Sequence, residues 1–332
     1  MPTIANGSRK KSQGASASSS RIRQPKRLRI SIIGAGRLGA TLGRALTQAG
    51  HRIELVVTKH QGSARRAAKL IGNGAEPLDA NQLEDLTSPE RDRLFGSDLV
   101  LISTPDDVLE AVARRLATLF RTQRSKGQRF ALHTSGALSS QVLRPLQTAG
   151  FAVGSLHPLI SIAGRTSRKN LFAGAYFCVE GNPAAVRVAR SLVRDLKGQS
   201  FTIDARSKAL YHAAAVMSSG HVTALFDVAI EMLKHCGLTA RRAQQLLQPL
   251  LASATTNLAS KSPAQALTGT FARGDVATAR RHLAAMKSKN LKEAAAAYLL
   301  LGMRSLELVE PVRSDIDRFR EIKKLLTRFR QV

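Results

Sequence analysis

The sequence predicts an α/β domain with a doubly wound parallel sheet, followed by an all-α domain. A β-branched run at residues 30–33 leads into closely spaced glycines and then into a helical pattern that ends at Gly50. From there to about residue 204, short apolar runs alternate with amphipathic stretches, the order typical of parallel strands joined by helices. Beyond this point long helical patterns rich in Ala and Leu replace the strands. We therefore divide the chain into a basic, acid-free tail (1–27), an α/β domain (28–204) and an all-α domain (205–332).

The glycines after the first predicted strand have the spacing G-x-G-x-x-G. Gly34 permits a sharp turn, Gly36 lets the backbone approach a pyrophosphate, and Gly39 lets the helix pack close to the strand. The N–H groups of the helix N-terminus then favour phosphate. Because a strand and a helix flank the motif, it predicts a dinucleotide site formed by Gly34, Gly36, Arg37, Leu38 and Gly39.

The second predicted strand ends without the acidic residue that usually binds the ribose hydroxyls of NAD. Its last residues are Val57 and Thr58, followed by Lys59, while Glu54 lies in mid-strand, where we expect it to point away. The missing acid and the nearby cation favour the 2′-phosphate of NADP(H) over NAD(H). We expect Thr58 and Lys59 to contact the cofactor, although Lys59 can equally be a simple surface charge.

The next predicted strands also end in polar residues. Ligands of parallel sheets bind outside the carboxyl ends of the strands, so we expect Ser103, Thr104 and Pro105 to line the cofactor cleft. Two later strands end in histidines, each of which can by itself be structural. Substrate contacts are predicted for the residues at these two ends: His133, Ser135, Gly136 and His157.

The helical domain offers two further candidate groups. Lys208 and His212 are spaced i, i+4 and therefore share one helix face, where a cation and an imidazole can donate protons or polarise a carbonyl. Ser219 follows on the same helical pattern as a polar contact. Arg273 lies in a loop between two glycines and can clamp an anion, while Asp275 can cap the following helix. The competing interpretation is a snorkelling lysine, small residues for helix packing and a buried Arg–Asp pair.

Composition limits the partners. The net charge is +28, but the basic residues are spread along all 332 residues, aromatic residues make up 4% and Trp is absent. The chain has few aromatic side chains on which the bases of single-stranded nucleic acid could stack. We therefore do not expect nucleic acid as a partner, although the basic tail leaves nucleic-acid binding as an alternative. No apolar run reaches the length of a membrane span by inspection, which predicts no membrane contact. Cys178 and Cys236 show no metal or redox spacing, so we expect no metal and a cytoplasmic location.

Four segments carry a resemblance to a known family: H-T-S-G at 133–136, S-L-H-P at 155–158, K-A-L-Y-H-A-A-A at 208–215 and A-L-T-G-T-F-A-R-G-D at 266–275. They resemble the Rossmann-like family with a C-terminal helical domain of unknown function. That family is similar in layout to pyrroline-5-carboxylate reductase, ketopantoate reductase and the deazaflavin-dependent NADP reductases.

The resemblance implies an NADP-type oxidoreductase that dimerises through the helical domain, with no settled substrate. This chain departs from the family pattern at Gly220, where Asn is usual, and at Thr270, where Pro is usual. The first departure removes a polar substrate contact, and the second bears on loop rigidity.

Together these observations predict hydride transfer between NADP(H) and a small, anionic C=O or C=N substrate. Lys208 and His212 are the candidate catalytic residues, in a cleft expected between the domains. The alternative is a dinucleotide-binding regulatory protein without turnover, which could associate with nucleic acid through its tail.

Overall fold

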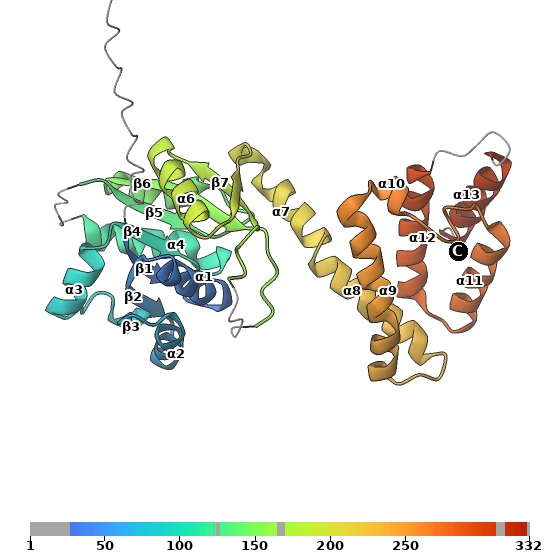
Figure 1. Cartoon of the computed structure of the whole chain (residues 1–332), viewed down its shortest axis with the longest axis horizontal. Helices are drawn as coiled ribbons and strands as arrows, with labels where there is room; N and C mark the ends of the chain where they lie inside the picture. Colours follow the sequence, from blue (N-terminus) through green and yellow to red (C-terminus); the bar gives the residue numbers. More distant parts are fainter. Residues whose placement is uncertain (1–26, 122, 124–126, 165–169, 310–315, 331–332) are drawn as a thin grey trace, which may run out of the picture. The chain divides into compact units, whose positions relative to one another are not determined.

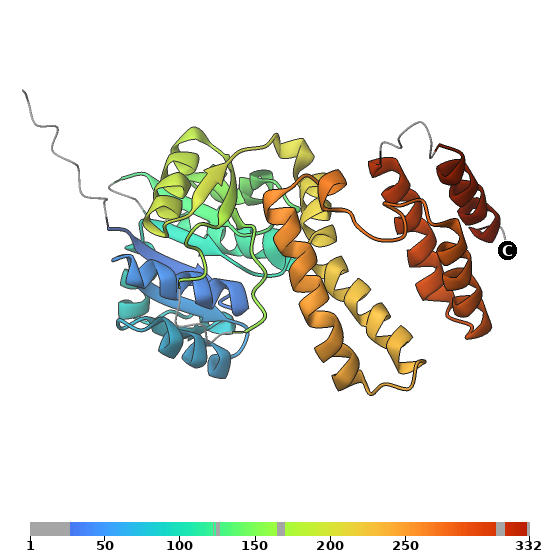
Figure 2. The ribbon, with the colours of Figure 1, turned by 45° about the vertical axis from the view of Figure 1, so that its right-hand side comes forward.

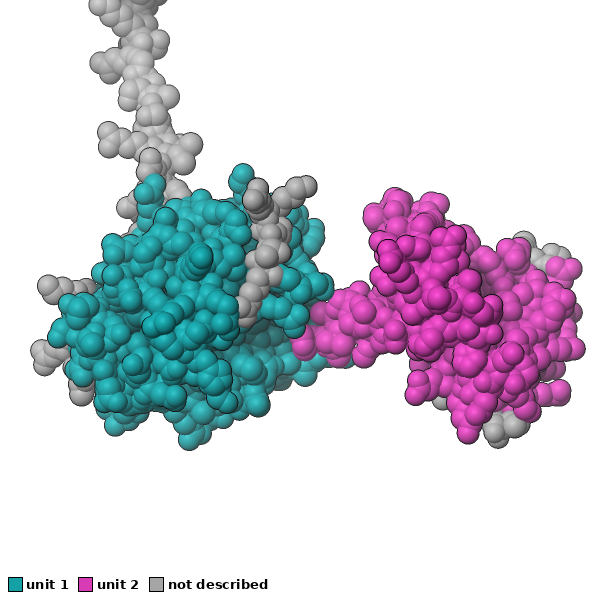
Figure 3. All heavy atoms as spheres, turned by 90° about the horizontal axis from the view of Figure 1, so that it is seen from below, with its two compact units in different colours: residues 1–211 teal, residues 212–332 magenta. Residues whose placement is uncertain are grey.

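The computed structural model describes residues 27–121, 123, 127–164, 170–309 and 316–330. The chain forms two compact units, residues 1–211 and 212–332, which Figure 3 colours separately. The division falls between Tyr211 and His212, inside helix α7 (Lys208–Met217). The predicted boundary at residue 204 corresponds to the end of the sheet. The predicted tail lies outside the described residues except for Arg27.

The first unit contains an eight-stranded sheet in the order β3-β2-β1-β4-β5-β6-β7-β8 (Figure 1). All neighbouring strands are parallel except β6 and β7, which are antiparallel. No helix occurs among the described residues between β6 and β7, and a parallel return normally requires such a crossover. The strands are β1 (Arg29–Ile33), β2 (Arg52–Thr58), β3 (Glu76–Asp79), β4 (Leu99–Ile102), β5 (Arg129–His133), β6 (Phe151–Pro158), β7 (Tyr176–Gly181) and β8 (Gln199–Phe201).

Helices cover both faces of this sheet, which confirms the doubly wound α/β class. Side chains alternate along each strand, so Ile32 joins one core cluster and Ile33 the other. Helices α1, α2 and α6 pack on the Ile32 face, and α3, α4 and α5 on the Ile33 face. The helices of this unit are α1 (Arg37–Gln48), α2 (Gln61–Ile71), α3 (Ser88–Phe95), α4 (Asp106–Phe120), α5 (Arg144–Thr148) and α6 (Pro183–Asp195).

The second unit is all helical in its described residues, as predicted, and α8 and α9 lie side by side in it (Figure 2). The Ala- and Leu-rich pattern over residues 207–235 predicts one long helix, and this prediction is wrong because the helix is interrupted between α7 and α8. Ser219 leaves the helical region with φ −131° and ψ −73°, and its Oγ donates to the carbonyl of Ala215 at 2.7 Å. Such back-bonding by serine competes with regular helix. The helices after α7 are α8 (Gly220–Lys234), α9 (Ala240–Ser260), α10 (Pro263–Ala266), α11 (Val276–Ser288), α12 (Lys292–Leu308) and α13 (Ile316–Arg330).

One described segment corrects the expectation about membrane-length runs. Residues Ala205–Lys234 are long and apolar enough to cross a membrane by length and composition, and none of the most apolar window is buried in the structure.

Candidate functional site

The glycine loop after β1 is shaped by two glycines that the fold requires and one that it does not. Gly34 has φ +86°, and a Cβ there would lie 2.6 Å from the backbone nitrogen of Thr104. A Cβ on Gly39 would lie 2.9 Å from the carbonyl oxygen of Gly34. A Cβ on Gly36, in contrast, would meet no described atom within 4 Å. Packing therefore explains why residues 34 and 39 must be glycine. Gly36, in contrast, borders open space, so packing does not require a glycine there.

This open position lies at the start of α1. Gly36 is the N-cap residue of α1 and has no side chain to cap it, and Arg37, the first helical residue, is exposed. Leu38 is partly buried against the core. The first turn of a helix has unpaired N–H groups and the positive end of the helix dipole. The loop thus has the backbone geometry of an anion cradle.

The end of β2 lacks an available carboxylate. Glu54 is buried on the sheet and forms ion pairs with Arg52 (3.1 Å) and Arg93 (3.7 Å), so it does not face the end of the strand. The hydroxyl of Thr58 donates to the carbonyl of His60 at 2.9 Å. Lys59 is exposed directly after the strand. The charged side chain that is exposed directly after β2 is therefore a cation.

The ends of β4 and β5 are tied to each other and to the glycine loop. Thr134 Oγ1 donates to Ser103 Oγ at 3.0 Å, and Ser103 in turn packs against Gly39. Thr104 Oγ1 is buried without a hydrogen-bond partner among the described residues, and the following Pro105 is exposed at the N-cap of α4. The predicted cofactor residues of β1 and β4 are thus in one place.

The loop after β5 is held by a buried polar network that includes Lys208. Ser135 Oγ donates to Asp106 Oδ2 at 2.9 Å and accepts the backbone N–H groups of Ala137 and Leu138. Lys208 Nζ donates to the carbonyl of Ser135 at 3.1 Å and to Ser155 Oγ at 3.0 Å. This network fixes both the loop, including the buried Gly136, and the lysine.

Lys208 is 1% exposed and points into the α/β unit, not into solvent. Burial lowers the pKa of its amino group, while electrostatic interactions with Cys178, Glu180 and Asp106 act in the opposite direction. The lysine is therefore a buried amine near the carboxylates of Glu180 and Asp106, and burial shifts it toward the neutral form. Its two hydrogen bonds give it a positioning role that sequence spacing did not reveal.

The two strand-end histidines have different environments. His133 is fully buried, and its Nδ1 accepts the backbone N–H of Ser135 at 3.1 Å. Burial, reinforced by the charge of Lys208, lowers its pKa to about 3, so the imidazole is neutral and adds no positive charge. His157 is half-buried, and its Nδ1 shares a 2.7 Å hydrogen bond with the hydroxyl of Tyr211.

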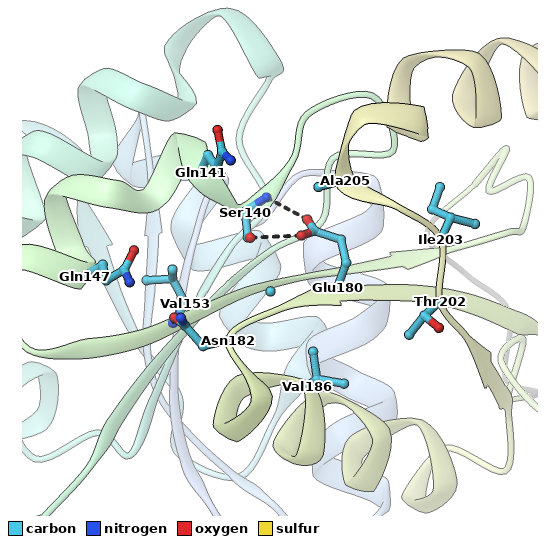
Figure 4. A pocket seen from close by; sticks show the side chains of 11 residues that line it. Ser140, Gln141, Gln147, Val153, Glu180, Asn182, Val186, Thr202, Ile203 and Ala205 are labelled. Carbon is cyan, nitrogen blue, oxygen red and sulfur yellow. Dashed lines mark hydrogen bonds between the residues drawn. The ribbon is translucent and has the colours of Figure 1, made fainter.

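A surface hollow of about 450 Å³ lies beside this network in the first unit, but none of the predicted site residues lines it. Glu180 lines the hollow and accepts hydrogen bonds from the backbone nitrogen of Ser140 (2.6 Å) and from Ser140 Oγ (2.9 Å), as Figure 4 shows. Glu180 thereby ties β7 to the segment that follows the Ser135 loop. We assign the hollow no part of the site.

The remaining predicted residues belong to the second unit. His212 is half-buried one turn after Lys208 on α7. Ser219 is exposed at the start of α8, and Arg273 is exposed in the turn before α11. Asp275 caps α11 by accepting the backbone N–H of Thr278 at 3.0 Å, as predicted. These local environments do not test the predicted roles of His212, Ser219 and Arg273 in catalysis or binding.

Three residues of the network were not predicted. Asp106, Ser155 and Tyr211 all lie within one or two residues of a predicted position, and Ser155 and Tyr211 lie inside the motifs at 155–158 and 208–215. The available signal was therefore a polar residue next to a predicted one. Only the fold shows that their side chains converge on Ser135, Lys208 and His157.

Comparison with known proteins agrees with this layout. A model for a Rossmann-like domain matches residues 13–158, and a model for a domain of unknown function, DUF2520, matches residues 175–305. No curated protein matches the sequence.

Several solved structures share the fold at low sequence identity. A candidate NADP oxidoreductase from Bacteroides fragilis is 21% identical with a TM-score of 0.66, covering 86% of this chain and 100% of that one. A reductive aminase from Aspergillus terreus, in complex with NADPH and ethyl levulinate, is 18% identical with a TM-score of 0.55, covering 84% and 92%. A 1-pyrroline-5-carboxylate reductase from Streptococcus pyogenes is 16% identical with a TM-score of 0.54, covering 84% and 98%. The chain therefore matches a Rossmann-like model followed by a DUF2520 model, in the order of the layout that its motifs resemble.

Proposed function

We propose that the protein is an NADP(H)-dependent oxidoreductase that transfers a hydride to or from a small C=O or C=N substrate. One observation carries the proposal. Gly36 is a glycine that the protein's own packing does not require, at the N-terminus of a helix and at the carboxyl end of β1. A glycine at this position leaves room for a pyrophosphate to approach the backbone closely.

The residues present fit a dinucleotide. Gly34, Gly36 and Gly39 with the first turn of α1 would hold the pyrophosphate, and Ser103 and Thr104 would lie along the nicotinamide half. The nicotinamide supplies the hydride, and the protein supplies orientation and charge. The buried Thr104 Oγ1 without a described partner gives this edge an unused donor.

We propose NADP(H) as the preferred form. Glu54 is engaged by two arginines, and Asp79, beside the end of β2, accepts the backbone N–H groups of Gln61 and Asn81. Lys59 is exposed directly after β2, and we propose that it contacts the 2′-phosphate. The reductive aminase of similar fold was solved with NADPH. Arg37 offers a second exposed cation on the glycine loop.

The substrate site is proposed at the ends of β5 and β6. Ser135, Gly136 and His157 would contact the substrate, with His133 as a neutral hydrogen-bonding group behind them. Ser219 and Arg273 are proposed as contacts from the helical unit, where the guanidinium of Arg273 suits an anionic group. Two relatives of this fold, the reductive aminase and the pyrroline-5-carboxylate reductase, bear names that point to C=N chemistry.

Lys208 and His212 remain the proposed catalytic pair, with a defined task for the lysine. Its amino group donates hydrogen bonds to the Ser135 carbonyl and the Ser155 hydroxyl, and we propose that it acts in its protonated form beneath the loop. A buried cation stabilises negative charge that develops on a substrate oxygen or nitrogen. His212, on the same helix, is the proposed proton donor.

The burial of Lys208 also favours the alternative function. A lysine with two internal hydrogen bonds can be purely structural, and then the protein would bind NADP(H) without turnover, as a regulatory protein. Calorimetric titration with NADPH and NADH tests binding. Oxidation of NADPH across keto acids, semialdehydes and cyclic imines then separates the enzyme from the sensor, because the sensor binds the cofactor and turns over none of these compounds.

We also propose a homodimer formed through the helical unit, in the cytoplasm. Large apolar side chains are exposed on α8, α9 and α12, among them Leu250 (67% exposed) and Leu300 (65% exposed). Apolar patches of this kind mark protein interfaces. Both cysteines are free thiols, which suits a reducing compartment.

A further inference from the structure

Helix α13 has a basic face that the proposed function does not use. Residues 316–330 contain six basic and two acidic residues, and the helix lies beyond residues 175–305 matched by the DUF2520 model. We define the basic face by five exposed residues that line a surface hollow of about 460 Å³: Arg320, Lys323, Lys324, Thr327 and Arg328.

The spacing of these residues places their charges in a row. Arg320, Lys324 and Arg328 are spaced i, i+4 and i+8, so they follow one side of the helix over a rise of about 12 Å. Lys323 and Thr327 form the adjacent row. A rise of about 12 Å corresponds to three to four phosphates along one strand of a duplex.

Most of this charge is not neutralised within the protein. The two acids of the helix are engaged, Asp317 with Arg320 at 3.2 Å and Glu321 with Arg280 of α11 at 3.3 Å. The other three cations of the basic face form no ion pair with a carboxylate in the described part of the chain: Lys323, Lys324 and Arg328. A partner that brings negative charge would therefore meet unpaired cations.

The opposite side of α13 decides what kind of partner fits. Ile322 and Leu326 are 0% and 1% exposed, and Phe319 packs against Gly274. Because the apolar side is used by the core, the helix has no free apolar face to insert into a lipid bilayer. Phe319 and the partly buried Phe329 lie on this packed side too, so α13 presents no aromatic ring to stack on single-stranded bases.

We propose that the basic face of α13 binds the phosphate backbone of a nucleic-acid duplex without reading its sequence. Lys and Arg contacts to phosphate require neither stacking nor apolar insertion. The scarcity of aromatic residues, which argued against nucleic acid at the level of composition, argues only against single strands. This inference is independent of the proposed oxidoreductase function, in which no residue of α13 takes part.

The test uses the full chain and a fluorescent random-sequence DNA duplex, with binding followed by anisotropy between about 50 and 200 mM salt. The triple variant K323Q/K324Q/R328Q removes the three unpaired cations. The matched control, R187Q/R190Q/R194Q, removes three exposed cations from another helix, α6 of the first unit. All six positions are exposed, and equal melting temperatures and NADPH affinities verify that both variants fold.

The slope of log K against log salt should become less steep by about 2 to 3 in the α13 variant, since each phosphate contact contributes about 0.9. Affinity at low salt should fall at least tenfold, while the α6 control changes the slope by less than 1. Equal behaviour of the two variants would overturn the proposal, because the binding would then reflect net charge alone. Tighter binding to a single strand of the same length, or α13-dependent binding to phosphatidylserine vesicles without duplex binding, would also overturn it.

Discussion

Replacement of Gly36 by Ala tests whether the glycine loop holds a pyrophosphate. A Cβ at this position meets no described atom within 4 Å, and the φ of −68° is open to any residue. The only expected structural cost is the exchange of Gly for Ala at an N-cap, about 1 kcal/mol or less. The same methyl group would project to where the phosphates must approach. We therefore expect NADPH affinity to fall by at least about a hundredfold, which corresponds to about 2.7 kcal/mol.

Two further glycines provide matched controls. Gly127 precedes the amino end of β5, away from the carboxyl ends of the strands, and a Cβ there also meets no described atom within 4 Å, so Gly127→Ala should change neither stability nor affinity. Gly34→Ala should instead destabilise the fold by more than about 1 kcal/mol, because φ is +86° and the new Cβ would lie 2.6 Å from Thr104. Calorimetric titration with NADPH and thermal melting measure both quantities. Unchanged NADPH affinity in folded Gly36→Ala would refute the assignment of the loop.

Four other predictions follow from the same structure. Lys59→Ala should raise the Kd of NADPH about tenfold, about 1.4 kcal/mol, and leave NADH unchanged, whereas Lys69→Ala on α2 should alter neither; equal effects on both cofactors would contradict a 2′-phosphate contact. Lys208→Met should lower kcat about a hundredfold or more with cofactor affinity retained, and an unchanged kcat would leave the lysine a structural role only. His133 has a folded-state pKa of about 3 against an ordinary value of 6.5, so the unfolded chain binds the extra proton and stability is lost as the pH falls below 6.5. Between pH 6.5 and 5 the free energy of unfolding should fall by about 2 kcal/mol because of this residue. In urea unfolding, the free energy of His133→Asn should lack this part of the decrease. Leu250→Glu should shift sedimentation from dimer to monomer, and a wild type that is already monomeric would contradict the dimer proposal.

The fold class could be predicted because local pattern and tertiary structure agree in the first unit. Residues 30–33 are buried on both faces of a sheet and are all isoleucine except Ser31, and Gly34 and Gly39 are required by contacts of the loop that directly follows. Local rules are sufficient in such a segment. The break at Ser219 and the antiparallel β7 could not be predicted in this way. The first depends on a serine that bonds its own helix, and the second on a connection whose described residues form no helix.

The candidate site could be predicted only as a set of residues, because their protonation and exposure depend on the fold. The spacing of Lys208 and His212 predicts a cation on one face of a helix, and both residues do lie on α7. The side chain of Lys208, however, reaches Ser135 and Ser155 on two other segments. The same burial that hides the lysine makes His133 neutral. A basic residue in a sequence therefore indicates where charge can be, and the tertiary contacts decide whether that charge faces a ligand or supports the loop that does. In this protein Lys208 lies beneath the loop, so any effect that it has on a substrate must pass through Ser135 and Ser155 or through its field.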